Sequence, residues 1–487
     1  MIKFGTGGWR AIIGEEFTKE NIQKLALAMC LKMKAEETEK QGIVIGYDRR
    51  FLSKEAVIWA SEIFGREGIP VWFVNRSVPT PLIMFYVMKH ELSYGMMVTA
   101  SHNPAIYNGI KIFTSGGRDA DQYQTANIEM WLEKADMIYR PYEEDWGQMP
   151  SASYEKFVKE GMIKEINPMN EYLDNIIGAI NMEAIKKRDL RIAIDPMYGV
   201  SLTALNTILS IARCTIETIN ANHDTLFGGK MPAPTAETMK YLQNFVTDRY
   251  CDIGIATDGD ADRLGVIDDQ GRYLKANEIL VMLYYYLLKY KGWRGPAVRN
   301  MATTHMLDKV AHRFGEECYE VPVGFKYISA KMKETDAIIG GESSGGLTVK
   351  GHINGKDGIY AAALLIEMIA VSGKKLSQIA QDIRDEFGNL YMEERDYHFT
   401  QERKEEIHHI LMEEKKLPDL PFQIKKLSYL DGCKVYFENG GWVIARFSGT
   451  EPLLRIFCEM EEAEMAKKIC NIFEEFLGYE GNNKKER

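Results

Sequence analysis

Several features that would point to a membrane or secreted protein are missing from this 487-residue chain. Its longest unbroken apolar run, residues 279–288, is too short to cross a bilayer. The first ten residues contain no apolar stretch of signal-peptide type. The seven cysteines are scattered, and no pair has CxxC spacing, so neither a zinc knuckle nor a disulfide framework is indicated. We therefore expect a cytoplasmic protein with reduced thiols and no membrane partner.

An excess of positive charge is also missing. The chain has 60 Lys and Arg against 70 Asp and Glu, a net charge of −10. Non-specific nucleic-acid binding relies on clustered Lys and Arg, so we expect no nucleic-acid partner, although a local basic pocket for a small anion stays open. The GxxxxGK[ST] pattern is absent, which disfavours a P-loop nucleotidase.

What the chain has is a regular alternation of short apolar strands and helical stretches, and its length predicts three or four domains. This alternation favours α/β domains with parallel or mixed sheets. We expect strands near residues 42–48, 71–75, 94–100, 190–196, 251–257 and 336–341, and one long helix over 170–187.

The last hundred residues differ from the rest. They predict a hairpin over 433–446 with an Asn-Gly turn, a strand at 454–458 and an amphipathic helix over 461–477. This pattern is typical of a small antiparallel α+β domain. We set the expected domain divisions at 1–165, 166–275, 276–393 and 394–487.

The first motif that carries chemistry is Thr99-Ala-Ser-His-Asn-Pro104, at the end of an expected strand. Its serine, Ser101, is held in a turn by Asn and Pro, and a serine that merely caps a turn is the ordinary alternative. His102 is adjacent and Lys111 follows nearby. A cation beside a serine suits phosphoryl chemistry, because the charge to be stabilised lies on oxygen.

The second motif places three carboxylates, Asp258, Asp260 and Asp262, after a strand. A solvated acidic turn is possible, but unpartnered carboxylates at this spacing repel one another and favour a hard cation. The spacing does not fit an EF-hand, which needs Gly where Arg263 stands and Glu where Asp269 stands. Three carboxylates are few for calcium and suit magnesium, which shares its coordination with phosphates and waters.

The third motif, residues 340–346, reads Gly-Gly-Glu-Ser-Ser-Gly-Gly. It matches the GxSxG nucleophile elbow of α/β-hydrolases, with Ser343 as the nucleophile, and this interpretation stays open. Alternatively, the Glu and the serines hydrogen-bond sugar hydroxyls. The nearby segment 351–357 adds a His and a Lys.

The fourth motif, residues 446–452, reads Arg-Phe-Ser-Gly-Thr-Glu-Pro, with Arg455 beyond it. Arginine, hydroxyls and an exposed glycine backbone make an anion cradle, although a hairpin end with a stray Arg is the simpler alternative. A weaker glycine-rich segment, residues 5–10, also ends in an Arg that could approach a phosphate. Together the motifs supply the parts that phosphoryl transfer on a phosphosugar needs.

These motifs, in this order and over essentially the whole chain, resemble the α-D-phosphohexomutase superfamily. The resemblance implies three related α/β domains with mixed sheets and a small C-terminal antiparallel α+β domain around a central cleft. It implies that the four domains contribute, in order, a phosphoserine loop, a metal loop, a sugar-binding loop and a phosphate-binding loop.

The resemblance also implies a role for individual residues. Ser101 would carry the phosphoryl group, and the catalytic set would be Ser101, Arg10, His102, Lys111 and Lys356. Mg²⁺ would be held by Ser101, Asp258, Asp260 and Asp262. The substrate-binding residues would be Arg263, Gly324, Lys326, Glu342, Ser344, Arg446, Ser448, Gly449, Thr450 and Arg455.

The implied reaction interconverts hexose 1-phosphate and hexose 6-phosphate through glucose 1,6-bisphosphate or its analogue. Gly346 stands where phosphomannomutase-type and phosphoglucosamine-type members usually have His, and Lys356 lies in a Gly-Lys-Asp-Gly setting. Both features favour glucose, with mannose or glucosamine as alternatives. A metal-dependent sugar phosphatase, a hydrolase using Ser343 and a non-enzymatic phosphosugar binder are more distant alternatives. The sequence does not predict the oligomeric state.

Overall fold

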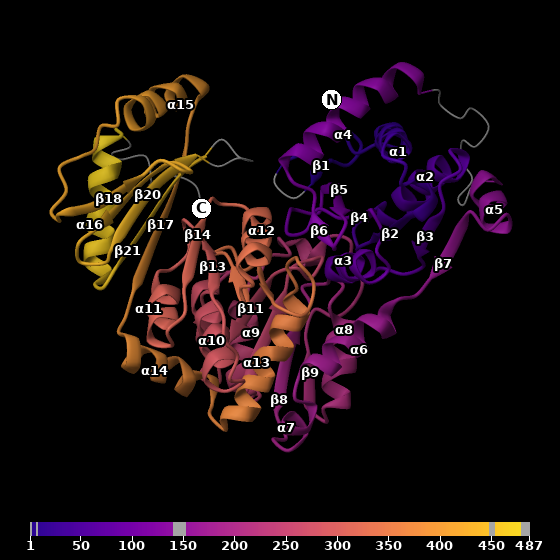
Figure 1. Ribbon diagram of the computed structural model, residues 1–487. Helices are drawn as coiled ribbons and strands as arrows, with labels where there is room; N and C mark the ends of the chain where they lie inside the picture. Colours follow the sequence, from indigo (N-terminus) through magenta and orange to yellow (C-terminus); the bar gives the residue numbers. More distant parts are fainter. Residues whose placement is uncertain (1, 6–7, 140–151, 448–452, 479–487) are drawn as a thin grey trace.

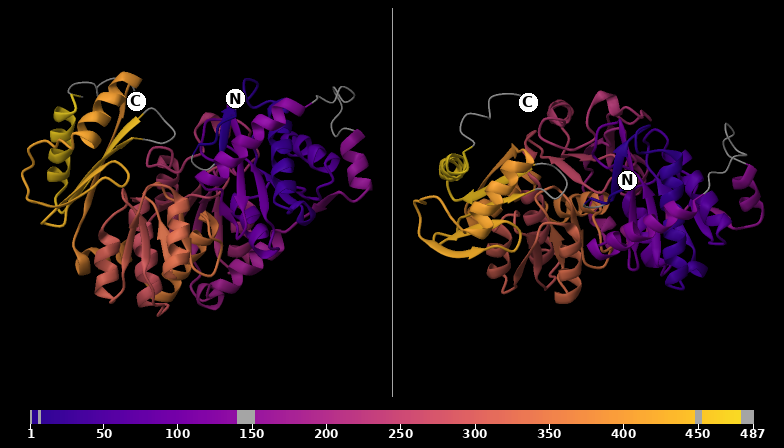
Figure 2. Two further views of the ribbon diagram at one scale, coloured as in Figure 1. Left: turned by 45° about the horizontal axis from the view of Figure 1, so that its top comes forward. Right: turned by 90° about the horizontal axis from the view of Figure 1, so that it is seen from above.

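The computed structural model describes residues 2–5, 8–139, 152–447 and 453–478 (Figure 1). Four sheets follow one another along an arc, from the indigo N-terminal part to the yellow C-terminal part, and the two turned views show the same succession (Figure 2).

The first sheet has the order β1-β5-β4-β2-β3-β7, with β6 paired to β5. Its strand β2 is wholly buried and apolar because helices cover both faces of the sheet. The elements are β1 (Trp9–Ile12), α1 (Lys19–Ala35), η1 (Glu39–Gln41), β2 (Ile43–Tyr47), α2 (Ser53–Arg66), β3 (Val71–Val74), α3 (Thr80–Lys89), β4 (Tyr94–Val98), β5 (Tyr107–Thr114), β6 (Arg118–Asp119), α4 (Gln122–Ile138), α5 (Ala152–Lys159) and β7 (Ile163–Ile166).

The second sheet has the order β12-β11-β10-β8-β9 and the third has the order β14-β13-β15-β16. The second part comprises α6 (Met169–Ala179), α7 (Met182–Lys186), β8 (Arg191–Asp195), α8 (Leu202–Ile211), β9 (Thr215–Thr218), η3 (Phe227–Gly229), α9 (Lys240–Asp248), β10 (Ile253–Thr257), β11 (Leu264–Ile267) and β12 (Tyr273–Leu274). The third comprises α10 (Ala276–Lys289), β13 (Ala297–Asn300), α11 (Met306–Arg313), β14 (Cys318–Val321), α12 (Phe325–Thr335), β15 (Ile339–Gly341), β16 (Leu347–Val349), α13 (Gly358–Ser372) and α14 (Leu376–Phe387).

The fourth sheet is fully antiparallel, in the order β17-β21-β20-β19-β18, as the C-terminal pattern predicts. Its elements are β17 (Tyr391–His398), α15 (Gln401–His408), η4 (His409–Glu413), β18 (Ile424–Ser428), β19 (Cys433–Phe437), β20 (Trp442–Phe447), β21 (Leu453–Met460) and α16 (Ala463–Phe476). The expected boundary at 393/394 falls inside β17.

The first three sheets share one arrangement, which confirms three related α/β parts. In each, three strands that are consecutive in the chain run parallel, and the next strand pairs antiparallel with the third: β5 with β4, β11 with β10 and β16 with β15. The three connecting loops contain the serine motif, the acidic motif and the Gly-Glu-Ser-Ser-Gly motif in turn. Each motif therefore lies at the carboxyl end of a parallel strand, where α/β sheets place their ligands.

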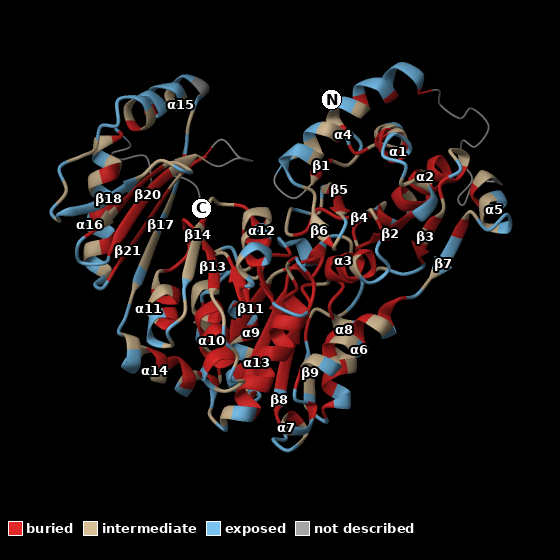
Figure 3. Ribbon diagram, in the orientation of Figure 1, coloured by how far each residue is buried: buried red, intermediate tan, exposed pale blue. Residues whose placement is uncertain are grey.

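One apolar core runs through the first three parts, from α3 through α6, α8 and α10 to α13. Helix α13 lies at its centre, with residues 358–370 all buried (Figure 3). The fourth part has a core of its own. Within the described ranges, we find no helix with the length and apolar character that a membrane span requires.

The expectation of one continuous helix over 170–187 is wrong. The chain leaves helical geometry at Ile180, which is extended with φ −114° and ψ 155°. Asn181 then starts α7, because its side chain accepts a hydrogen bond from the backbone N–H of Ala184.

Candidate active site

The acidic triad, which we define as Asp258, Asp260 and Asp262, is gathered in the loop after β10. Each residue offers an oxygen within 4.8 Å of the others, and all three are buried. The Oδ1 atoms of Asp260 and Asp262 have no hydrogen-bond partner among the described residues. Buried carboxylate oxygens without partners are costly, and a Mg²⁺ ion, which prefers such oxygens, fits them.

Lys111 from β5 balances part of this charge. Its Nζ donates to the Oδ2 atoms of Asp260 and Asp262, at 2.7 Å each. Burial lowers the pKa of Lys111, but the two carboxylates outweigh it, so the net pKa is raised and the ammonium persists. Burial raises the pKa of Asp258 well above its usual value, and Asp262 adds to this. Burial opposes the ionisation of Asp262 too, yet Lys111 and neighbouring cations hold the pKa of Asp262 well below its usual value.

Ser101 lies directly against the triad. Its Oγ donates to Asp258 Oδ2 at 2.7 Å, and the residue is buried. Its backbone is left-handed, with φ +52°, a conformation that costs energy for a residue with a side chain. His102 Nδ1 lies 3.2 Å from Ser101 Oγ. Burial, helped by Arg263 and Arg10, lowers the pKa of His102 to about 2, so its imidazole is neutral at pH 7.

Three further cations come from three different parts of the chain. Arg10, on β1, donates to Asn103 Oδ1 at 2.6 Å. The backbone N–H of Arg263 donates to Asp258 Oδ1 at 3.0 Å, while its buried Nε has no partner among the residues described. Lys356 Nζ lies 3.4 Å from Asp262 Oδ2. Cations gathered around a serine and a cation site can stabilise a transferring phosphoryl group.

The Gly-Glu-Ser-Ser-Gly motif forms the turn between the antiparallel strands β15 and β16. The turn is closed by the bonds Glu342 N–H to Gly346 O and Gly345 N–H to Glu342 O. A nucleophile elbow needs a strand followed by a helix, whereas a strand follows here. The hydrolase interpretation with Ser343 is therefore wrong. Ser344 lies exposed in the same turn.

Gly346 ends this turn at a crowded point. A Cβ added there would lie 2.2 Å from Lys356 Cδ and 3.2 Å from Glu342 Oε1. Because Gly346 has no side chain, Lys356 can pass close to it and reach the triad, and Glu342 lies on the other side of the glycine. A larger residue at 346 would therefore force the Lys356 side chain to shift from this path.

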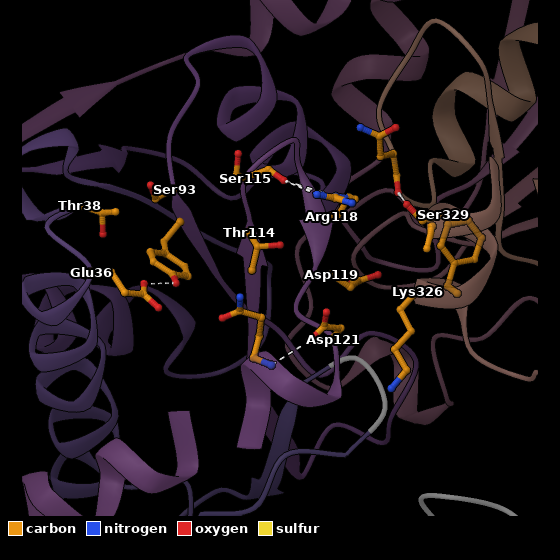
Figure 4. Close-up of a pocket in the computed structure, with 15 residues that line it drawn as sticks. Glu36, Thr38, Ser93, Thr114, Ser115, Arg118, Asp119, Asp121, Lys326 and Ser329 are labelled. Carbon is orange, nitrogen blue, oxygen red and sulfur yellow. Dashed lines mark hydrogen bonds between the residues drawn. The ribbon is translucent and has the colours of Figure 1, made fainter. Parts of the chain in front are cut away.

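A cavity of about 400 Å³ lies between β5–β6 and α12 (Figure 4), and neither Ser101 nor the acidic triad is among the residues that line it. Its lining includes Asp119 and Lys326, which Figure 4 shows on the same side of the cavity. Gly324 starts α12 with φ +134°, a conformation that side chains disfavour, and so brings Lys326 into the first helical turn. Asn354 Nδ2 donates to Gly116 O at 2.8 Å and joins the first and third parts beside the cavity.

Arg446 and Arg455 lie directly opposite each other on β20 and β21. Opposed like charges are unfavourable unless an anion joins them. Asp431 and Asp396 lie 3.3 Å and 3.5 Å from their respective Nε atoms. The expected partners Ser448, Gly449 and Thr450 lie outside the described residues.

Sequence reasoning missed residues that support the site. Thr80 Oγ1 donates to Asp260 Oδ2 at 2.6 Å, and its backbone N–H donates to Asp260 O at 2.9 Å. No motif marks Thr80. Asp48 and Arg50, at the end of β2, bind the loop that contains Ser101, and the only signal for them in the sequence was the acid at that strand end.

A buried serine lies against three carboxylates that suit a metal ion, and cations from three related α/β parts surround it. This combination is typical of an enzyme that transfers phosphoryl groups. Models of the phosphoglucomutase/phosphomannomutase family match the whole architecture: α/β/α domain I over residues 1–138, domain II over 170–271, domain III over 275–387 and the C-terminal domain over 406–475. The chain belongs to this family of phosphohexomutases, enzymes that move a phosphoryl group within a sugar phosphate.

Individual relatives carry different substrate names. A phosphoglucomutase/phosphomannomutase of Thermococcus kodakarensis is 31% identical over 474 residues, covering 96% of this chain and 97% of its own. A "Probable phosphoglucosamine mutase" of Methanosarcina barkeri is 31% identical over 477 residues, covering 96% and 99%.

Solved structures agree on the fold. One from Thermus thermophilus, with a name of the phosphomannomutase type, has 27% identity and a TM-score of 0.81 and covers 98% of this chain and 99% of its own. The N-acetylphosphoglucosamine mutase of Aspergillus fumigatus, 14% identical with a TM-score of 0.59 and covering 98% and 96%, was solved with GlcNAc-6P and magnesium.

Proposed function

We propose that this phosphohexomutase interconverts glucose 1-phosphate and glucose 6-phosphate through a phosphoserine at Ser101 and glucose 1,6-bisphosphate. The observation that carries this proposal is the position of Ser101 Oγ, 2.7 Å from Asp258 of the acidic triad. A serine used only to cap a turn would have no reason to face three buried carboxylates.

Asp258, Asp260 and Asp262 would hold Mg²⁺, together with an oxygen of the phosphorylated Ser101. When bound, the metal supplies charge neutralisation that makes the serine oxygen a better leaving group. Lys111 keeps two triad carboxylates in place, and Arg10 and Arg263 face the charge of the transferring group.

In the forward reaction, the bond from Ser101 Oγ to phosphorus breaks as a bond forms from phosphorus to the free hydroxyl oxygen of the sugar phosphate. Lys356, beside Asp262, would enter this step as an uncharged amine, take the hydroxyl proton and leave the step as the ammonium. The neutral His102 lies beside Ser101 Oγ. The bisphosphate then turns over, and its other phosphate passes to Ser101 by the reverse steps.

The remaining predicted residues bind the substrate. Glu342 and Ser344 would hydrogen-bond the sugar hydroxyls, and Gly324 and Lys326 would shape the adjoining wall. The phosphate that does not react would be held by Arg446, Ser448, Gly449, Thr450 and Arg455. We propose four contributing domains close to the expected divisions 1–165, 166–275, 276–393 and 394–487, with the last division placed before β17 so that the strand stays whole.

Glucose preference rests on Gly346 and Lys356, which occupy one another's space. A His at 346, usual in mannose- and glucosamine-type members, would displace this lysine. Mannose 1-phosphate and glucosamine 1-phosphate are the alternative substrates, and relatives carry both names.

The test compares Ser101→Ala with Ser343→Ala, a matched loss of one hydroxyl. Peptide mapping of the wild type should find one phosphate, on the peptide that contains Ser101. Ser101→Ala should remove this phosphate and nearly all mutase activity, and Ser343→Ala should keep both. Substantial mutase turnover by Ser101→Ala would refute the assignment, and net release of phosphate from glucose 1-phosphate would favour a phosphatase.

A further inference from the structure

Arg50 is a buried cation in the first part that no predicted role uses. It is 3% exposed and follows the end of β2. Its guanidinium converges on the serine loop, which we define as residues 99–107. Nη2 donates to Ser101 O at 2.7 Å and Asn103 O at 2.6 Å, and Nη1 donates to Pro104 O at 2.9 Å and Tyr107 O at 3.0 Å.

Four carbonyl oxygens that converge on one point repel one another and any anion nearby. A single guanidinium satisfies all of them, because its donors form a rigid planar fork. Lysine, with a compact ammonium, cannot reproduce this arrangement. The serine loop thus depends on Arg50 for its shape.

The same strand end also holds the other side of Ser101. Asp48 Oδ2 accepts from Thr99 Oγ1 at 2.6 Å, and Thr99 Oγ1 accepts from the backbone N–H of Ser101 at 2.8 Å. Asp48 Oδ2 lies 3.4 Å from Arg50 Nε. Both peptide groups that flank Ser101 are therefore tied to the end of β2, and these ties sustain the left-handed φ of +52°.

The guanidinium is also covered from the second part. It lies 4.8 Å from the ring centroid of Phe227, so water does not compete for its donors.

Arg49, the preceding residue, contrasts with it. Its Nη1 donates at 3.4 Å and 3.3 Å to Tyr198 O and Ala221 O of the second part, and not to the serine loop.

We propose that Arg50 is a positioning residue for phosphoryl transfer: it fixes the serine loop so that Ser101 Oγ faces the acidic triad in line with the incoming oxygen. This inference rests on the proposed phosphoserine at Ser101. Arg50 does not touch the reacting atoms. It acts through the loop carbonyls, and its four bonds also remove carbonyl charge that would otherwise oppose a phosphate on Ser101.

The experiment uses the full-length protein with Mg²⁺ and measures the single-turnover transfer of phosphate from glucose 1,6-bisphosphate to Ser101, besides kcat and KM. Arg50→Lys is the main variant, because it keeps a cation beside Asp48 and is expected to fold. Arg50→Ala is assayed with and without millimolar guanidinium, and Arg49→Ala is the matched control.

We expect Arg50→Lys to slow both single-turnover transfer and kcat by about 100-fold, since small misplacement of a reacting group has this effect, with KM changed by less than about three-fold. Added guanidinium should raise the transfer rate of Arg50→Ala at least about ten-fold, and added methylammonium should not. Arg49→Ala should transfer phosphate at about the wild-type rate.

Folded Arg50→Lys with wild-type transfer to Ser101 would overturn the inference while leaving the phosphoserine assignment intact. A KM that rises by as much as kcat falls would show a general structural role and would also overturn it. Wild-type protein that takes up no phosphate on Ser101 would overturn the proposed function, and the inference with it.

Discussion

Replacing Gly346 with alanine adds one methyl group at the point where Lys356 crosses the turn between β15 and β16. The new Cβ would lie 2.2 Å from Lys356 Cδ and 2.9 Å from its Cγ. Both distances are far below van der Waals contact, so the lysine side chain has to shift. The φ of Gly346 is not positive, and alanine therefore fits the backbone.

The displaced atoms belong to a flexible side chain, so the substitution should leave the protein folded. It should nevertheless lower the activity, because the displaced lysine belongs to the site. Lys356 Nζ would lose its place 3.4 Å from Asp262 Oδ2. Losing a positioned proton-transfer group costs about 10²- to 10⁴-fold in rate, which corresponds to about 3–5 kcal/mol of transition-state stabilisation. We expect Gly346→Ala and Lys356→Met each to lower kcat by this order.

The assay is a double-mutant cycle on kcat for glucose 1-phosphate. Since both changes remove the same group, Gly346→Ala/Lys356→Met should be no slower than the slower single variant, within about three-fold. Gly178→Ala is the control, because a Cβ at this position meets no atom within 4 Å. Full activity of Gly346→Ala, or losses that add in the double variant, would refute the reasoning.

Three further predictions concern the metal, the sugar and the response to pH. Asp260→Asn should lose about 100-fold or more in activity at a fixed Mg²⁺ concentration, and a magnesium titration after chelation checks this; full turnover without divalent metal would contradict it. The kcat/KM should be highest for glucose 1-phosphate and about two- to twelve-fold lower for mannose 1-phosphate, because one neutral hydrogen bond changes. It should be lowest for glucosamine 1-phosphate, because the cations of the site repel its ammonium group. A coupled assay with all three substrates tests this order, and a highest kcat/KM for glucosamine 1-phosphate would contradict it. Burial, with Arg299, lowers the pKa of His305 from 6.5 to about 3. Between these two pH values His305 is protonated in the unfolded chain but not in the folded chain. The free energy of unfolding therefore falls as the pH falls. At pH 5 this costs about 2 kcal/mol, and His305→Gln should lose correspondingly less stability between pH 7 and pH 5 in denaturant titrations; an unchanged loss would show that His305 is not responsible.

Local patterns were enough to predict the elements and the order of the motifs. The acidic triad could be predicted because its three carboxylates come from a short stretch of one loop, so their proximity follows from chain connectivity. The hairpin β19–β20 could be predicted for the same reason, since its turn residues and apolar alternation are local. The break between α6 and α7 was missed because apolar periodicity continues past Ile180, while the Asn181 cap depends on one side-chain bond.

Contacts between distant segments were decided only by the tertiary structure. The sequence contains both Gly346 and Lys356, but only the return of the chain after β16 shows that one occupies the space of the other. Ser343 is not the serine of a nucleophile elbow, because an antiparallel strand and not a helix follows it, and this pairing appears only in the tertiary structure. No motif marks Arg50, because the groups that it binds are four carbonyl oxygens of another loop. Residue types and spacing along the chain determine which chemistry is available, whereas strand pairing and burial decide which of these groups meet and which are excluded from water.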